Sequence, residues 1–95
     1  MTAPKFEALN VPPDCVEKGG VEVLRASVVD GAVSIAMRRS FDDPFTWGVL
    51  LADLARHAAR IYALETELTE SQALSLIQDG LSSELLNPTD TDSAL

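Results

Sequence analysis

The sequence contains few of the residues that build disulfide or metal-held frameworks. It has one cysteine, Cys15, and one histidine, His57, among 95 residues. A single thiol cannot close an intramolecular disulfide, and no HxxxH, HExxH or CxxC spacing is present to hold a metal ion. We therefore expect no metal site and no bound cofactor. Cys15 follows Pro-Pro-Asp without a neighbouring base, which is typical of an unreactive thiol.

Long hydrophobic runs are also absent. The longest apolar stretches are a few residues long, whereas a bilayer-spanning helix needs roughly 18–20. The N-terminus has no basic segment followed by an apolar run, so no signal peptide is expected. These absences predict a cytoplasmic protein that does not insert into membranes.

Basic residues are missing from the C-terminal third of the chain. The formal net charge is −8, and all seven Lys and Arg residues lie within residues 1–60, whereas residues 61–95 carry seven acids. Such a charge distribution argues against nucleic-acid binding, which requires basic groups along a phosphate backbone. The acidic third is typical of a solubilising surface, and its alternative is a docking face for a basic protein partner.

The remaining composition is globular, with 46% hydrophobic and 23% charged residues in a length that suits one domain. We expect residues 1–20 to form an extended arm, because prolines and glycines punctuate them. The apolar residues of the arm, Phe6, Leu9 and Val11, could lie along a sheet edge or cap the core irregularly, and we favour the second interpretation. The single domain should span residues 21–86, and residues 87–95 should form a disordered acidic tail.

A β-hairpin is the clearest signal in the chain. Two runs of alternating character, within residues 21–39, flank Asp30-Gly31, a dipeptide that accepts the positive φ angles of a type I′ turn. A two-residue turn pairs residue 29 with 32, 28 with 33, and so on outward. This register places apolar side chains on one face, polar ones on the other, and Glu22 opposite Arg39.

Two helices should follow the hairpin. Asp43 and Pro44 form a cap and first-turn signal for a helix over 44–64. Large apolar residues recur along it at three- and four-residue spacing, and alanines flank this stripe, where another backbone could approach closely. Thr69 and Gln72 form a capping box for a second helix over 70–86, in which Gly80 could cause a break.

The expected fold class is therefore α+β, with the order ββαα. A two-stranded sheet is marginal by itself and leaves both edges unpaired. The N-terminal arm could add a third strand, or two chains could pair their hairpins across a two-fold axis into a larger antiparallel sheet. We favour the homodimer.

Candidate binding residues come from two places. Arg25 and Arg38 share the polar face of the hairpin, and guanidinium groups bind carboxylates and other anions bidentately. Arg56, His57 and Arg60 form a compact polar face on the first helix, from which a second subunit could contribute. A solvated surface explains both clusters more simply.

Catalysis has one candidate pair. Asp53 lies one helical turn before His57 and could orient it as a general base. No serine or cysteine is tied to this helix by a recognisable motif, so a nucleophile is missing. We assign no catalytic residue and expect a solvated ion pair instead.

The stretch from Asp42 to His57 carries a family resemblance. Its motif, W-G-x-L-L-A-D-x-A-R-H, together with the Asp30-Gly31 turn, resembles a family of short bacterial proteins catalogued only as a domain of unknown function. The resemblance covers residues 19–65 and implies a small stand-alone protein without assigning an activity. Combined with the residue patterns, it favours a non-catalytic module that self-associates or binds another protein, with an anion-binding protein as the alternative.

Overall fold

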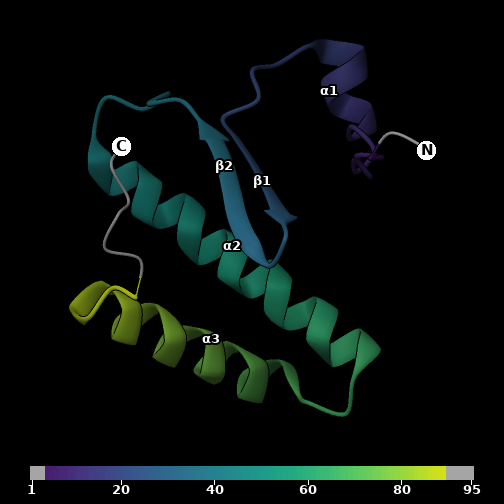
Figure 1. Cartoon of the computed structure of the whole chain (residues 1–95). Coiled ribbons are helices and arrows are strands. Elements are labelled where there is room, and N and C mark those ends of the chain that lie inside the picture. Colours follow the sequence, from purple (N-terminus) through teal and green to yellow (C-terminus); the bar gives the residue numbers. More distant parts are fainter. Residues whose placement is uncertain (1–3, 90–95) are drawn as a thin grey trace. The chain divides into compact units, whose positions relative to one another are not determined.

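The computed structural model describes residues 4–89, which contain three helices and one two-stranded sheet (Figure 1). The chain divides after Ser40 into two compact units, an N-terminal one with the strands and a C-terminal one with the two long helices. We describe each unit by itself. The α+β class and the ββαα order are confirmed, with a short helix added before the strands. The expectation of a single domain over 21–86 stays a prediction.

The N-terminal unit contains α1 (Pro13–Lys18), β1 (Leu24–Val29) and β2 (Ala32–Met37). The two strands are antiparallel, and their register is the predicted one. Its pairs are Leu24↔Met37, Arg25↔Ala36, Ala26↔Ile35, Ser27↔Ser34, Val28↔Val33 and Val29↔Ala32.

The tight turn between the strands fixes this register. Asp30 has φ 51° and Gly31 has φ 79°, as a type I′ turn requires at both central positions. Aspartate and glycine tolerate this left-handed region better than other residues do. Because the turn has only two residues, the strands cannot shift without turning every side chain to the opposite face.

The N-terminal arm differs from the sequence-based expectation. Residues 13–18 form a short helix instead of an extended segment, with Pro13 at its first position and Gly19 at its C-cap. Gly19 has φ 76°, so the chain turns sharply where the helix ends. Over residues 4–89, the sheet has two strands, and the arm does not contribute a third.

The C-terminal unit is a pair of helices, α2 (Pro44–Glu65) and α3 (Glu70–Leu86). Both predicted caps are present. The Asp43 carboxylate accepts a hydrogen bond from the backbone N–H of Phe45 at 2.9 Å. At the start of α3, the Thr69 hydroxyl accepts from the Gln72 N–H at 3.1 Å, and the Gln72 side chain accepts from the Thr69 N–H at 2.9 Å. These bonds satisfy backbone donors that lack partners inside the helices.

Helix α3 runs through Gly80 without a break. Apart from Gly80 itself, its two neighbours and the nearby backbone of α3, no heavy atom lies within 4 Å of the position that a Cβ on Gly80 would occupy. The glycine therefore disfavours the helix through backbone entropy alone, and the 17-residue helix tolerates it.

The two long helices pack through alanines. They lie side by side (Figure 1), and Ala59 of α2 and Ala73 of α3 are 0% and 2% exposed. Such small side chains allow two helix backbones to approach closely, as the flanking alanines of α2 predicted. Part of the apolar stripe of α2 is open to solvent. Leu51, Leu54 and Ile61 are 42–53% exposed, whereas Trp47, Leu50 and Ala58 of the same stripe are half-buried.

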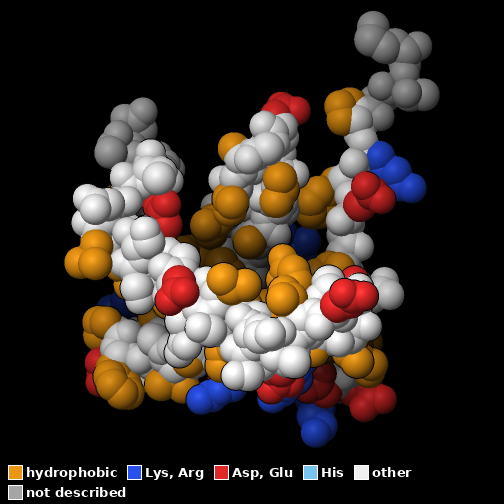
Figure 2. Space-filling view, turned by 90° about the horizontal axis from the view of Figure 1, so that it is seen from below, with side chains coloured by type: hydrophobic (Ala, Val, Ile, Leu, Met, Phe, Trp, Pro, Cys, Tyr) orange, Lys and Arg blue, Asp and Glu red, His pale blue; other side chains and the backbone are white. Residues whose placement is uncertain are grey.

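Only these two alanines are buried within residues 4–89. In Figure 2, hydrophobic side chains lie open on the surface among the acidic ones. No helix within those residues has the length and apolar character needed to cross a bilayer. Residues 90–95, most of the tail predicted for 87–95, lie outside the described range.

Candidate functional site

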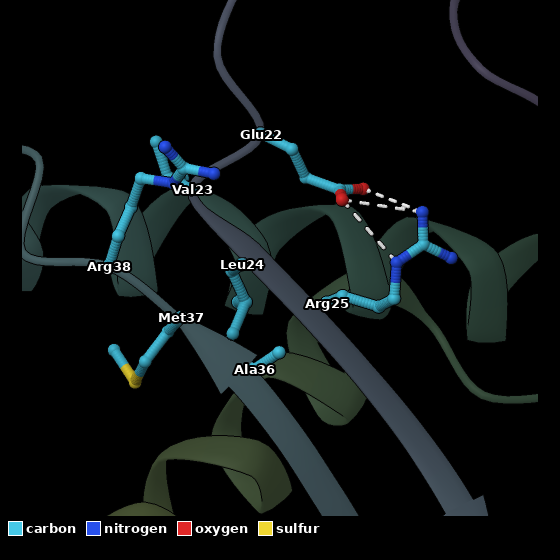
Figure 3. A pocket seen from close by; sticks show the side chains of 7 residues that line it. All are labelled: Glu22, Val23, Leu24, Arg25, Ala36, Met37 and Arg38. Atoms are coloured by element: carbon cyan, nitrogen blue, oxygen red, sulfur yellow. Dashed lines mark hydrogen bonds and ion pairs between the residues drawn. The ribbon is translucent and has the colours of Figure 1, made fainter.

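The open end of the hairpin contains a shallow depression of about 260 Å³. Both strands contribute to it, together with the residues just beyond them (Figure 3). Its lining residues are Glu22, Val23, Leu24, Arg25, Ala36, Met37 and Arg38. Two of the arginines that the sequence marked as anion-binding candidates, Arg25 and Arg38, therefore border one depression.

Arg25 already has partners from its own chain. Its guanidinium donates to the Glu22 carboxylate, with the shortest contact, Arg25 Nη2 to Glu22 Oε2, at 3.1 Å. The guanidinium carbon also lies 6.0 Å from the centre of the Phe6 ring, at the limit of a cation–π contact. The carboxylate of Glu22 thus pairs with an arginine three residues along the same chain. Its expected position opposite Arg39 stays a prediction, because the paired strands end at Leu24 and Met37.

Arg38 occupies the other side of the depression. Its backbone N–H donates to the Val23 carbonyl at 3.1 Å, which continues the hydrogen-bond ladder beyond the paired strands. Figure 3 shows the guanidinium groups of Arg25 and Arg38 on opposite sides of the strand ends. In this conformation the two arginines do not form one bidentate grip.

The polar face of α2 forms two exposed ion pairs. Arg56 Nη1 lies 3.9 Å from an Asp53 carboxylate oxygen, and Arg60 Nε lies 3.8 Å from a Glu70 carboxylate oxygen. All four side chains are more than half exposed, so such pairs contribute little stability. Arg60 and Glu70 also link α2 to the start of α3.

His57 does not meet the Asp53 carboxylate. Its Nδ1 lies 2.9 Å from the main-chain oxygen of Asp53. Because a carbonyl only accepts, this bond requires the ring proton to be on Nδ1. The ring is exposed on α2 and lines neither the depression at the hairpin end nor the one described next.

A second depression, of about 240 Å³, lies on the helix pair. It is lined by Tyr62, Leu68, Ala73, Leu76 and Ile77. Sequence analysis did not single out this group. The sequence did contain a hint of this depression. Leu76 and Ile77 are adjacent apolar residues of α3, so they broaden its apolar surface beyond a narrow stripe.

The hairpin of the N-terminal unit presents an apolar face. It contains four large side chains that are more than half exposed. They are Val28 (75%), Val33 (66%), Ile35 (53%) and Met37 (52%). Single exposed apolar residues are ordinary, but a contiguous face of them indicates an interaction surface. We call these four residues the hairpin face.

The family model described as "Domain of unknown function (DUF5076)" matches residues 8–89. The chain belongs to this family. The match includes the strands and both long helices, and it extends beyond residues 19–65, where the motif around α2 indicated a resemblance. Membership confirms the expected family and assigns no activity.

A solved structure from Rhodopseudomonas palustrus CGA009 is similar to this DUF5076 chain. It shares 50% sequence identity, covers 100% of this chain and 97% of its own, and has a TM-score of 0.75. That protein is described as a "putative pyruvate dehydrogenase from the photosynthetic bacterium". No curated protein matches this chain.

Proposed function

We propose that this chain is a self-associating module that forms a homodimer and has a non-catalytic role. The observation that supports this function most strongly is the small amount of enclosed apolar surface. Within residues 4–89, only Ala59 and Ala73 are buried, while the four large side chains of the hairpin face are more than half exposed. Full burial of a Val, Ile or Met side chain contributes about 1.5–3 kcal/mol, so whatever part of this face a second copy covers favours association.

The hairpin also needs strand partners, which helices cannot supply. A two-stranded sheet is marginal in water, and each outer edge presents unpaired N–H and C=O groups. Another strand can replace water as the partner of these groups along the whole edge, whereas a helix offers no matching row of donors and acceptors. A second copy of the chain offers such a strand together with a matching apolar face.

A homodimer is favoured over a different protein partner because the surface is self-complementary. An isologous contact repeats one patch on both subunits, so two hairpin faces can continue one another side by side, with β-branched and flexible apolar residues in contact across the two-fold axis. The hairpin face has no charged member, and two copies can therefore meet without repulsion between like charges.

Light scattering coupled to size exclusion, from low to high micromolar concentration, tests the proposal. We expect twice the mass of the chain and an unfolding midpoint that rises with protein concentration, because association stabilises the folded state. Val33→Lys places a charge on the hairpin face and should shift the protein to monomer. Ser34→Lys, on the opposite face, is the matched control and should remain dimeric. A wild-type monomer at every concentration would contradict the proposal.

Anion binding at the hairpin end is a second candidate, because Arg25 and Arg38 border the depression there. The bond from Arg25 to Glu22 competes with any carboxylate ligand. A thermal-shift screen with citrate, acetate and phosphate distinguishes this function from self-association. A stabilisation that disappears in Arg38→Gln but persists in Arg56→Gln would favour it.

We do not propose for this chain the activity that is named for the similar Rhodopseudomonas palustrus protein. In this chain, the one acid–base pair that the sequence offered is not assembled, since His57 contacts the main chain of Asp53 and not its carboxylate. An assay of pyruvate-dependent reduction of an electron acceptor provides the test. Turnover that His57→Ala abolishes would replace our proposal with an enzymatic one.

A further inference from the structure

The hydrogen-bond ladder shows which backbone groups of the hairpin point outward. Arg38 donates to Val23, so these two residues form a hydrogen-bonded pair. Hydrogen-bonded and non-hydrogen-bonded pairs alternate along an antiparallel ladder. The pairs Leu24↔Met37, Ala26↔Ile35 and Val28↔Val33 are therefore the non-bonded ones, and their N–H and C=O groups face the two outer edges. On β2, these residues are Val33, Ile35 and Met37.

We propose that two chains join through the outer edges of β2, antiparallel about a two-fold axis at Ile35, and form a four-stranded sheet in the order β1-β2-β2-β1. This inference rests on the proposed self-association and specifies its edge and register. Ile35 then faces Ile35 of the second copy, and Val33 faces its Met37. All three outward residues of β2 gain strand partners at once, whereas a register shifted by two residues leaves one of them opposite residue 31 or 39.

Charge complementarity distinguishes the two edges. In the register about Ile35, Arg38 lies opposite Ala32 of the second copy and diagonal to its Asp30, so each end of the new strand pair brings opposite charges together. The corresponding pairing of two β1 strands about Ala26 would place Glu22 opposite Asp30 of the second copy. Like charges directly opposite one another destabilise a strand pair.

The surroundings of the two strands point to the same edge. All six residues of β2 are exposed, whereas Leu24 and Ser27 of β1 are partly covered. Phe6 lies over the Arg25 side chain, so the N-terminal segment of the same chain approaches β1. Strand β2 is the more accessible partner.

A pair of proline variants tests the edge. The N–H of Ile35 and that of Ala26 both point outward, so proline at either position removes an edge donor and leaves the hydrogen bonds within the hairpin intact. We expect Ile35→Pro to be monomeric and Ala26→Pro to remain a dimer. Circular dichroism checks that both variants keep their helices and strands. A dimer for Ile35→Pro with a monomer for Ala26→Pro would assign the contact to β1 and overturn the inference.

Single cysteines test the register without a proline. In a Cys15→Ser background, Ile35→Cys places two thiols in directly opposed positions, about 5.5 Å apart between Cα atoms, which suits a disulfide. Val33→Cys is the matched control, because its two copies lie about 13 Å apart along the strands. We expect oxidation to cross-link the first variant and not the second.

The outcomes separate this inference from the proposed function. A wild-type monomer refutes self-association and the strand contact together. If the wild type is a dimer but Ile35→Cys does not cross-link, the β2 contact alone is refuted. The same conclusion follows if both proline variants remain dimers. If Ser34→Cys cross-linked in preference to Ile35→Cys, the two-fold axis would lie at Ser34 and the register about Ile35 would be wrong.

Discussion

The strand hairpin and the helix pair are both specified by local signals, but they enclose apolar side chains to different degrees. The hairpin has a two-residue turn and an alternating pattern, and four of the five large residues of its apolar face are more than half exposed, Leu24 being partly covered. The helix pair has two capped ends and buries Ala59 and Ala73 where α2 and α3 meet. The helices thus share a small internal contact that the strands lack. In this chain, a segment can have a well-defined local structure without burying its large apolar side chains.

Enlarging Ala59 should have the largest effect on the helix pair. Ala59 is 0% exposed, so Ala59→Leu adds a side chain where no space exists and should destabilise the protein by about 1–3 kcal/mol. Urea unfolding followed by circular dichroism measures the change. Ala52→Leu, at an exposed position of the same helix, should alter stability by less than about 0.5 kcal/mol. Equal effects for the two variants would show that the helices do not pack closely at Ala59.

The corresponding change in the hairpin is Gly31→Ala. Gly31 has φ 79°, a conformation that costs other residues roughly 1–2 kcal/mol, so the turn should weaken and the strands should fray. Chemical shifts of β1 residues and thermal unfolding report the loss. Asp30→Asn should be nearly neutral, because asparagine also tolerates a positive φ. Unchanged strand shifts in Gly31→Ala would mean that the turn does not maintain the register.

Removal of the cap of α3 should have a smaller effect. Thr69→Ala eliminates the hydroxyl that accepts from the Gln72 N–H, and we expect a loss of about 1 kcal/mol. Ser71→Ala, two residues later in the first turn, is the control and should differ little from wild type. Thermal unfolding of the two variants side by side gives the comparison. If Ser71→Ala were the more harmful change, the capping box would not be the element that starts α3.

The smallest effect should come from the ion pair between α2 and α3. Arg60 and Glu70 are separated by 3.8 Å, and both side chains are more than half exposed, so solvent screens their attraction. Arg60→Gln should therefore change the free energy of unfolding by less than about 0.5 kcal/mol, at low and at high salt. A loss above 1 kcal/mol would indicate that the pair and not the alanine contact holds the helices together.

Sequence reasoning succeeded where a few neighbouring residues determine the structure. The strand register follows from Asp30-Gly31, and the start of α3 follows from Thr69 and Gln72. Each feature depends on contacts within a few residues along the chain, so a pattern in the sequence contains nearly all the information needed. The extension of α3 through Gly80 was not settled in this way, because a propensity of about 1 kcal/mol does not decide the fate of a long helix.

The short helix α1 was missed because six residues are too few for an apolar periodicity. A proline at its first position and a glycine just after its last residue were the available signals, and they match the usual asymmetry of helix ends. Residues 1–20 were instead interpreted as extended because of their prolines and glycines. Proline begins a helix as readily as it prevents one, so composition alone could not distinguish the two.

The candidate site was predicted less well than the fold. The positions of Arg25 on β1 and of His57 on α2 followed from the pattern, whereas Arg38 lies one residue beyond β2. The partners of Arg25 and His57 did not follow from the pattern. Glu22 binds Arg25 three residues along the same chain, a contact that depends on the rotamers of the two side chains and not on the strand register. His57 contacts a main-chain oxygen one turn earlier, a choice that depends on the side-chain rotamer and not on residue spacing.

The empty space beside Gly80 has an evolutionary meaning. A methyl group there would meet no atom of the described chain beyond its two neighbours and the nearby backbone of α3, and alanine would favour the helix. Natural sequences settle above the stability that selection requires and do not reach a maximum. Alanine at position 80 would therefore raise the stability of the helix, yet the sequence keeps glycine. If relatives of this protein also keep glycine at this position, then a requirement other than the stability of the folded chain selects for it. A contact with another molecule would be such a requirement.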